Sequence, residues 1–159
     1  MNTNTSTGTW TITKEIPTLS NAGKYVDING LDAAAAQLEE AITEIENSFN
    51  GKKDLGSINW KADAKATLEE GFTKISTVIT EIAEKAKKLK QIASEIDAYK
   101  EAEKNAQDLL SKITNFPTTY STQVARDNAL EVLNGYQQEF SDCQAEMNNH
   151  IKTISDLNS

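Results

Sequence analysis

The chain has 159 residues and a formal net charge of -8, with 24 acidic side chains against 16 lysines and arginines. This length is enough for one domain with its own core. The acidic balance disfavours binding to nucleic acid or anionic lipid, because phosphate groups repel a negatively charged protein. The N-terminus lacks the features of a signal peptide, and no apolar run approaches the roughly 20 residues of a membrane span. We therefore expect no nucleic-acid partner and no transmembrane segment.

Residues 1–28 are rich in Thr and Asn, and Trp10 and Ile12 alternate with Thr in the manner of a β-strand. No second segment of the chain has a strand pattern that would pair with this one. We therefore predict a flexible or extended N-terminal arm over 1–28 that can lie on the helices that follow.

A first helix is predicted from about Leu31 to Ser48. Acidic residues lie in its first half, where the helix dipole favours them, and Asn50-Gly51 ends it. Its apolar residues recur at steps of four and three, at Leu31, Ala35, Leu38, Ile42, Ile45 and Phe49. Residues 50–59 then form a turn.

The second helix carries the most regular pattern in the chain. It is predicted to start near Asn59 or Trp60 and to end at Phe116-Pro117, because proline breaks a helix. A 3.5-residue apolar period keeps one edge of a helix against a partner helix. This seam predicts the helix–helix interface residues Leu68, Phe72, Ile75, Ile79, Ile82, Leu89 and Ile96, with Ala86 and Ala93 between them.

Two features modify this seam. From Ala93 to Ala102 the steps become three residues each, a stammer that predicts local overwinding or a change of partner helix. Apolar residues outside the strict seam, such as Val78 and Ile92, predict a further helical surface from a second copy or a related chain.

A third helix is predicted to start after Ser121 or Thr122. Short turns on both sides of the central helix make neighbouring helices antiparallel. The predicted fold is therefore all-α: an elongated antiparallel helical hairpin with a Trp-x-Ala turn over 29–114, and a C-terminal helix over 115–159 that folds back on the long central helix.

The sequence contains no arrangement that predicts catalysis. His150 is the only histidine, which rules out a histidine-rich metal site, and we expect no catalytic triad around it. Cys143, the only cysteine, lies on the apolar face of the third helix, which favours a buried, inert thiol. An intermolecular disulfide or a reactive thiol is the alternative. We expect neither enzymatic activity nor a metal or other cofactor.

Trp60 lies where the turn meets the second helix, so it can wedge between the two arms of a hairpin. The stretch from Trp60 to Ala62, with Leu68 and Phe72 after it, resembles the Trp-x-Gly turn of the WXG family of type VII secretion substrates. Ala62 stands where that family has glycine. The resemblance covers roughly residues 30–105 and implies a helix, a turn and a second helix.

In that family the second helix typically closes with a Tyr-x-x-x-Asp/Glu export motif. Tyr99-Lys100-Glu101-Ala102-Glu103 fits this motif on the second helix. Tyr99 and Glu103 are four residues apart, so they share one helix face and can be read together by a receptor. The resemblance thus implies that Tyr99 and Glu103 form part of an export signal.

The resemblance implies a non-enzymatic type VII secretion substrate or targeting partner of a Gram-positive bacterium. The longer form resembles the small helical accessory proteins that pair with larger type VII toxins. It implies synthesis in the cytoplasm, secretion without a cleavable signal peptide, and contact with the secretion machinery. The implied complex is a homodimer, or a heterodimer with a related helical hairpin protein or a toxin N-terminal domain. Two alternatives stay open: a structural coiled-coil assembly protein of a phage or cell envelope, and a helical toxin subunit.

Overall fold

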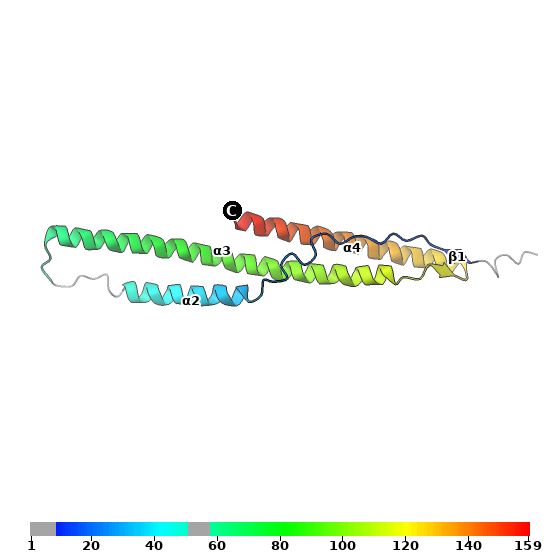
Figure 1. Ribbon diagram of the computed structural model, residues 1–159, viewed down its shortest axis with the longest axis horizontal. Helices are drawn as coiled ribbons and strands as arrows, with labels where there is room; N and C mark the ends of the chain where they lie inside the picture. Colours follow the sequence, from blue (N-terminus) through cyan, green and yellow to red (C-terminus); the bar gives the residue numbers. More distant parts are fainter. Residues whose placement is uncertain (1–8, 51–57) are drawn as a thin grey trace, which may run out of the picture. The chain divides into compact units, whose positions relative to one another are not determined.

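The computed structural model describes residues 9–50 and 58–159. They form three helices, α2 (Leu31–Asn50), α3 (Ala62–Thr114) and α4 (Gln123–Leu157), and two short strands, β1 (Trp10–Thr11) and β2 (Thr119–Tyr120) (Figure 1). These residues are mostly helical, so the prediction of an all-α fold is confirmed at that level. Most of the turn predicted over 50–59 lies outside the described residues.

Local capping signals account for the helix boundaries. The Lys61 carbonyl accepts a hydrogen bond from the Lys65 N–H at 2.9 Å, so α3 begins just after Trp60. The Thr122 hydroxyl accepts the Ala125 N–H at 3.1 Å and caps α4. The α3 helix ends at Thr114, before Phe116-Pro117.

The described chain divides into two units, and the boundary falls inside α3. Unit 1 contains residues 9–26 and Glu95–Asp156, and unit 2 contains residues 27–50, 58–94 and Leu157–Ser159. The boundary lies between Ser94 and Glu95, within the three-residue steps that begin at Ala93.

Unit 1 pairs the C-terminal part of α3 with α4. Glu95 contacts His150 near one end of the pair, and Lys112 lies over the Tyr136 ring, 5.5 Å from its centroid, farther along. This order of contacts requires the two helices to run in opposite directions. The buried cluster of unit 1 comprises Ile12, Tyr99, Ala102, Ala106, Leu109, Ile113, Leu133, Phe140 and Met147.

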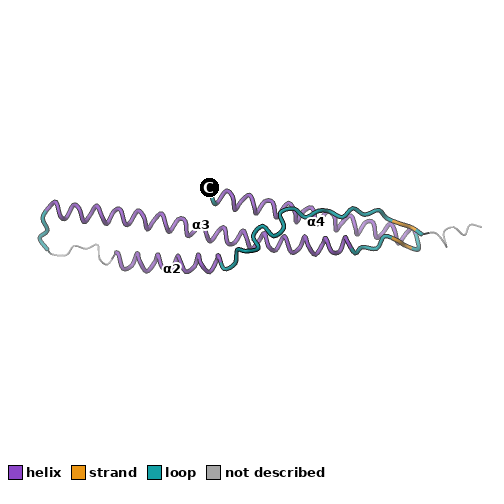
Figure 2. The backbone as a smooth tube through the Cα atoms, in the orientation of Figure 1, coloured by secondary structure: helices purple, strands orange, loops and turns teal. Residues whose placement is uncertain are grey.

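Residues 9–26, here named the strap, lie along α3 and α4 in unit 1 (Figure 2). At its start, β1 pairs antiparallel with β2, with Trp10 opposite Tyr120. The Ile12 N–H donates to the Thr118 carbonyl at 3.0 Å, and the Ile12 side chain enters the buried cluster. The expectation that Trp10 has no strand to pair with is therefore wrong. The partner strand is only two residues long, which is too short to produce an alternating pattern in the sequence.

Polar contacts hold the rest of the strap. The Lys14 ammonium donates to the carbonyls of Thr114 and Phe116, at 2.5 and 2.8 Å, just where α3 ends. The Thr114 carbonyl is one that the helix itself leaves unpaired, and Phe116 lies just beyond the helix end. On α4, the Gln144 amide bonds both the N–H and the carbonyl of Ser20. The strap then turns at Asn21 and Gly23, both with positive φ (63° and 74°).

Unit 2 pairs α2 with the N-terminal part of α3. The Phe49 and Phe72 rings meet edge to face at 5.7 Å, and Glu39 forms an ion pair with Lys90 at 3.6 Å. These contacts also require opposite helix directions. The buried apolar side chains in the described part of unit 2 are Ala35, Ile42, Ala86 and Ala93. Three of these four are alanines, so unit 2 buries much less apolar volume than unit 1.

Candidate interaction surfaces

The predicted seam on α3 consists of two columns of side chains, each with a seven-residue spacing. In the first column every residue is buried or half-buried: Phe72, Ile79, Ala86 and Ala93. The second column is Leu68, Ile75, Ile82, Leu89 and Ile96, of which Ile96 is buried in unit 1. Ile75 and Ile82, in the middle of this column, are 46% and 41% exposed. Unit 2 therefore covers one column of the seam and leaves the centre of the other open.

Other apolar side chains of unit 2 are exposed beside this column. Val78 lies three residues from Ile75, on the same face of α3, and is half exposed. On α2, Leu38 and Ile45 are seven residues apart, share a face, and are both exposed. We call Leu38, Ile45, Ile75, Val78 and Ile82 the open stripe of unit 2.

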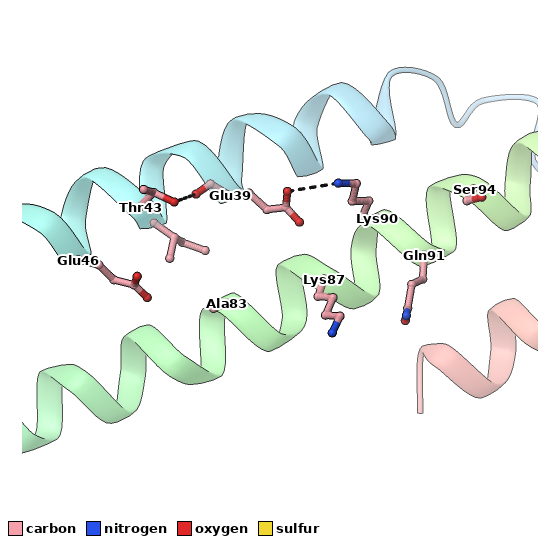
Figure 3. A pocket seen from close by; sticks show the side chains of 9 residues that line it. Glu39, Thr43, Glu46, Ala83, Lys87, Lys90, Gln91 and Ser94 are labelled. Carbon is pink, nitrogen blue, oxygen red and sulfur yellow. Dashed lines mark hydrogen bonds and ion pairs between the residues drawn. The ribbon is translucent and has the colours of Figure 1, made fainter.

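A groove of about 660 Å³ lies between α2 and α3 in unit 2 (Figure 3). Glu39 reaches from α2 toward Lys90 of α3, and the Thr43 hydroxyl donates to the Glu39 carbonyl at 3.0 Å. Both charged partners are well exposed, so their ion pair contributes little to stability. The groove is lined by Glu39, Ile42, Thr43, Glu46, Ala83, Lys87, Lys90, Gln91 and Ser94. These residues offer apolar surface between charged edges, which suits packing against another helix better than chemistry.

Trp60 lies two residues before α3, and Ala62 is the first residue of that helix. The Trp60 N–H donates to the Ile58 carbonyl at 3.0 Å, and the Trp60 side chain is 38% exposed. Residues 51–57 of the predicted turn lie outside the described residues. Trp60 therefore presents an exposed aromatic ring at the N-terminal end of α3.

Tyr99 and Glu103 lie together on the α3 face beneath the strap. Tyr99 is only 1% exposed. Its hydroxyl donates to the Asn21 carbonyl, lies 3.0 Å from Oε2 of Glu103, and accepts the Lys24 N–H at 3.4 Å. The same Glu103 oxygen accepts the Gly23 N–H at 2.6 Å. The two residues of the predicted export motif thus share a face, and strap residues occupy that face.

An aromatic contact completes this site. The Tyr25 ring meets the Tyr99 ring edge to face, with centroids 5.0 Å apart. Burial, and secondly the hydrogen bond to Glu103, raises the pKa of Tyr99 to about 12, and burial also raises the pKa of Tyr25. Both hydroxyls are therefore neutral near pH 7.

The strap residues at this site, Asn21, Gly23, Lys24 and Tyr25, were not identified from the sequence. The Ser-Asn-Ala-Gly stretch before Lys24 carries a turn signal, because Asn and Gly tolerate positive φ. That signal locates a turn, but it contains no information about contacts with residues some 80 positions away.

Two further side chains of unit 1 have structural roles. His150 Nδ1 lies 2.6 Å from Glu95 Oε2 and links α4 to α3. Cys143 is half-buried, and burial together with Glu146, Asp142 and Glu139 raises the pKa of its thiol. A raised pKa keeps the thiol protonated and less reactive.

Within residues 9–50 and 58–159, no three His, Cys, Asp or Glu side chains gather closely enough to hold a metal ion. In the same ranges, no helix combines the length and the apolar character that a membrane crossing requires. Comparisons with protein families, curated proteins and solved structures found no match to this chain.

Proposed function

We propose that this chain is a non-enzymatic type VII secretion protein, either a substrate or a targeting partner. Unit 2 acts as a WXG-like antiparallel helical hairpin with a Trp-x-Ala turn at Trp60 and Ala62, and it binds another helical hairpin through its open stripe. The observation that carries the proposal is the exposure of Ile75 and Ile82 in the centre of an otherwise covered seam.

The energetics of the open stripe favour association. Fully burying an exposed isoleucine side chain contributes roughly 1.5–3 kcal/mol. The five side chains of the stripe are 37–54% exposed, so a partner that covers them gains part of this free energy at each position and offsets part of the cost of association. Exposed apolar residues clustered in this way mark interaction sites in soluble proteins.

The charges of unit 2 favour a partner with the same kind of surface. Helix α2 carries five acidic side chains and no Lys or Arg: Asp32, Glu39, Glu40, Glu44 and Glu46. A short stretch of α3 carries four lysines: Lys85, Lys87, Lys88 and Lys90. A second copy, or a toxin N-terminal domain of similar hairpin form, can pair the acidic helix of one chain with the lysines of the other. Such a complex is a homodimer or a heterodimer.

The secretion part of the proposal is supported by the order of motifs along the chain. A short helix, a tryptophan before a seamed helix, and Tyr99 with Glu103 on that helix follow one another as in the WXG family. On this proposal the protein is made in the cytoplasm and exported without a cleavable signal peptide. Tyr99 and Glu103 form part of the signal that the secretion machinery reads.

Two measurements test the proposal. Ile75→Asp with Ile82→Asp places charges in the open stripe, and we expect loss of self-association or toxin binding in sedimentation equilibrium. Circular dichroism should remain helical, because neither residue is buried in the isolated chain. In a strain with a working type VII system, Tyr99→Ala and Glu103→Ala should stop export into the medium while circular dichroism shows that each variant remains folded. Glu101→Ala, an exposed acid on the same turn, is the matched control.

A wild-type chain that stays in the cytosol of that strain would contradict the secretion proposal. It would favour the structural coiled-coil alternative. A chain that remains monomeric at all concentrations, with and without a toxin helical domain, would contradict the role of the open stripe.

A further inference from the structure

The atoms of Tyr99 and Glu103 that a receptor would bind already form hydrogen bonds with other residues of the chain. The Tyr99 hydroxyl contacts the backbone of Asn21 and Lys24, and the Glu103 carboxylate accepts the Gly23 N–H at 2.6 Å. Tyr25 covers the edge of the Tyr99 ring. With Tyr99 only 1% exposed, no receptor can contact its hydroxyl while residues 21–25 remain in place.

The cover over this site has the properties of a removable segment. Asn21, Gly23 and Lys24 are themselves exposed, and Tyr25 is half-buried. No disulfide fixes the strap, since Cys143 is the only cysteine. The buried Ile12 anchor lies at the other end of the strap.

We infer that the strap is a releasable cover of the Tyr99–Glu103 motif, and that residues 21–25 must leave α3 before the secretion machinery can bind it. This inference rests on the proposed function. The covered state protects Tyr99 from solvent and occupies Glu103. Release exposes both groups on one face of α3, four residues apart.

The groups of the strap also define the chemistry of the partner. A receptor that replaces the strap must supply an N–H donor to Glu103, an acceptor for the Tyr99 hydroxyl, and an aromatic or apolar surface for the Tyr99 ring. These are the contacts now made by Gly23, Asn21 and Tyr25. The strap and the receptor therefore compete for the same atoms.

Two glycines of this chain offer a matched pair of variants. Gly23 (φ 74°) and Gly30 (φ 70°) both have positive φ, and a Cβ at either position would meet nothing within 4 Å. Gly23→Val therefore weakens the cover by straining its backbone, and it leaves the side chains of Tyr99 and Glu103 unchanged. Gly30→Val imposes the same strain in the segment before α2. The cost of positive φ predicts a roughly tenfold rise in the uncovered population for Gly23→Val.

The first readout is the ionisation of Tyr99 in the full chain, followed by NMR with labelled tyrosine rings. If Tyr99 ionises only when uncovered, a tenfold rise in the uncovered population lowers its pKa from about 12 to about 11. Tyr25→Ala removes the edge-to-face contact with the Tyr99 ring, so it is a second releasing variant and should also lower the pKa of Tyr99. Gly30→Val should leave the pKa of Tyr99 unchanged.

The second readout is the initial rate of export by the type VII system. Gly23→Val and Tyr25→Ala should raise this rate several-fold over wild type and over Gly30→Val. Adding Tyr99→Ala to either variant should abolish this increase in export rate, because the secretion machinery cannot bind an uncovered motif that lacks its tyrosine.

The outcomes separate this inference from the proposed function. If the releasing variants uncover Tyr99 but export at the wild-type rate, the strap does not control recognition. The proposed function then stands, as long as Tyr99→Ala still stops export. If neither variant changes the Tyr99 pKa, the strap is not the cover and the inference is overturned. If the wild-type chain is not exported, both proposals fail.

Discussion

Unit 1 and unit 2 contain consecutive parts of the same helix, α3, and they bury it to different degrees. In unit 1, α3 packs with α4 and the strap, and the large side chains Tyr99, Ile113, Leu133 and Met147 are each less than 2% exposed. In unit 2, α3 packs with α2, and Leu157–Ser159 lie beside it only near Lys85–Ile92, so Ile75 and Ile82 remain exposed. One helix partner covers one column of a seam, and a second segment is needed to cover the other.

This difference shows what an apolar pattern can and cannot specify. The heptad spacing requires that both columns be covered, but it does not say whether the cover comes from the same chain. In unit 1 the chain supplies the cover itself. In unit 2 the uncovered column is the surface on which we place a partner.

The largest difference should appear when one large apolar residue from each unit is truncated. Leu133→Ala in unit 1 should lower the free energy of unfolding by about 2–5 kcal/mol, because it leaves a cavity in a closed core. Ile82→Ala in unit 2 should cost less than about 1 kcal/mol in the dilute, isolated chain, because its side chain is already exposed. Urea unfolding at low protein concentration measures both. Equal losses would mean that the open stripe is covered after all.

The next prediction concerns the contribution of the strap to unit 1. Lys14→Met removes two hydrogen bonds to the carbonyls of Thr114 and Phe116, and we expect a loss of about 1–3 kcal/mol. The matched control is Lys65→Met on α3 of unit 2, where the ammonium is exposed and lies 4.0 Å from Glu69. The control should change stability by no more than about 0.5 kcal/mol. A loss no larger than the control would show that the end of α3 does not depend on the strap.

A pH effect should be confined to unit 1. The folded chain raises the pKa of Tyr99 above its ordinary value of 10, to about 12, so folding favours the neutral hydroxyl. This contribution to stability is complete below pH 10 and is lost as the pH rises from 10 to 12. Tyr99→Phe has no hydroxyl to ionise and should lose less stability over that range. Denaturant titrations of both chains at pH 9, 10, 11 and 12 measure the difference, and parallel curves would contradict the prediction.

The smallest effect is expected for the ion pair of unit 2. Glu39 and Lys90 are 3.6 Å apart, but both side chains are exposed by 40% or more. A double-mutant cycle with Glu39→Gln and Lys90→Met should give a coupling energy below about 0.5 kcal/mol in the isolated chain. Neither residue belongs to the open stripe, so the coupling should stay below this value when a partner binds the stripe. A coupling that increases in the complex would place the partner over the groove instead.

Several features of the fold were predictable because they depend on local pattern. The apolar period and the prolines located the helices, although α3 starts at Ala62 and not at Asn59 or Trp60. The three-residue steps that begin at Ala93 coincide with the boundary between the units, where α3 passes from its packing in unit 2 to its packing in unit 1.

Other features could not be predicted, because they depend on contacts between distant segments. The pairing of Trp10 with Tyr120 joins residues 110 positions apart through a strand of two residues. The burial of Tyr99 depends on the strap. The sequence spacing places Tyr99 and Glu103 on one face of α3, but it does not show that Asn21–Tyr25 occupy that face. The exposure of Ile75 and Ile82 depends on how much of the seam one partner helix can cover.

Residue-resolved amide hydrogen exchange along α3 tests the contrast between the units most directly. In the dilute, isolated chain, amides in 95–113 should exchange slowly and amides in 62–94 should exchange much faster, with the change close to Ser94. Adding a partner hairpin, or raising the concentration if the chain pairs with itself, should slow exchange in 62–94 alone. Uniform protection along α3 in the dilute chain, or no change in 62–94 on association, would contradict the account.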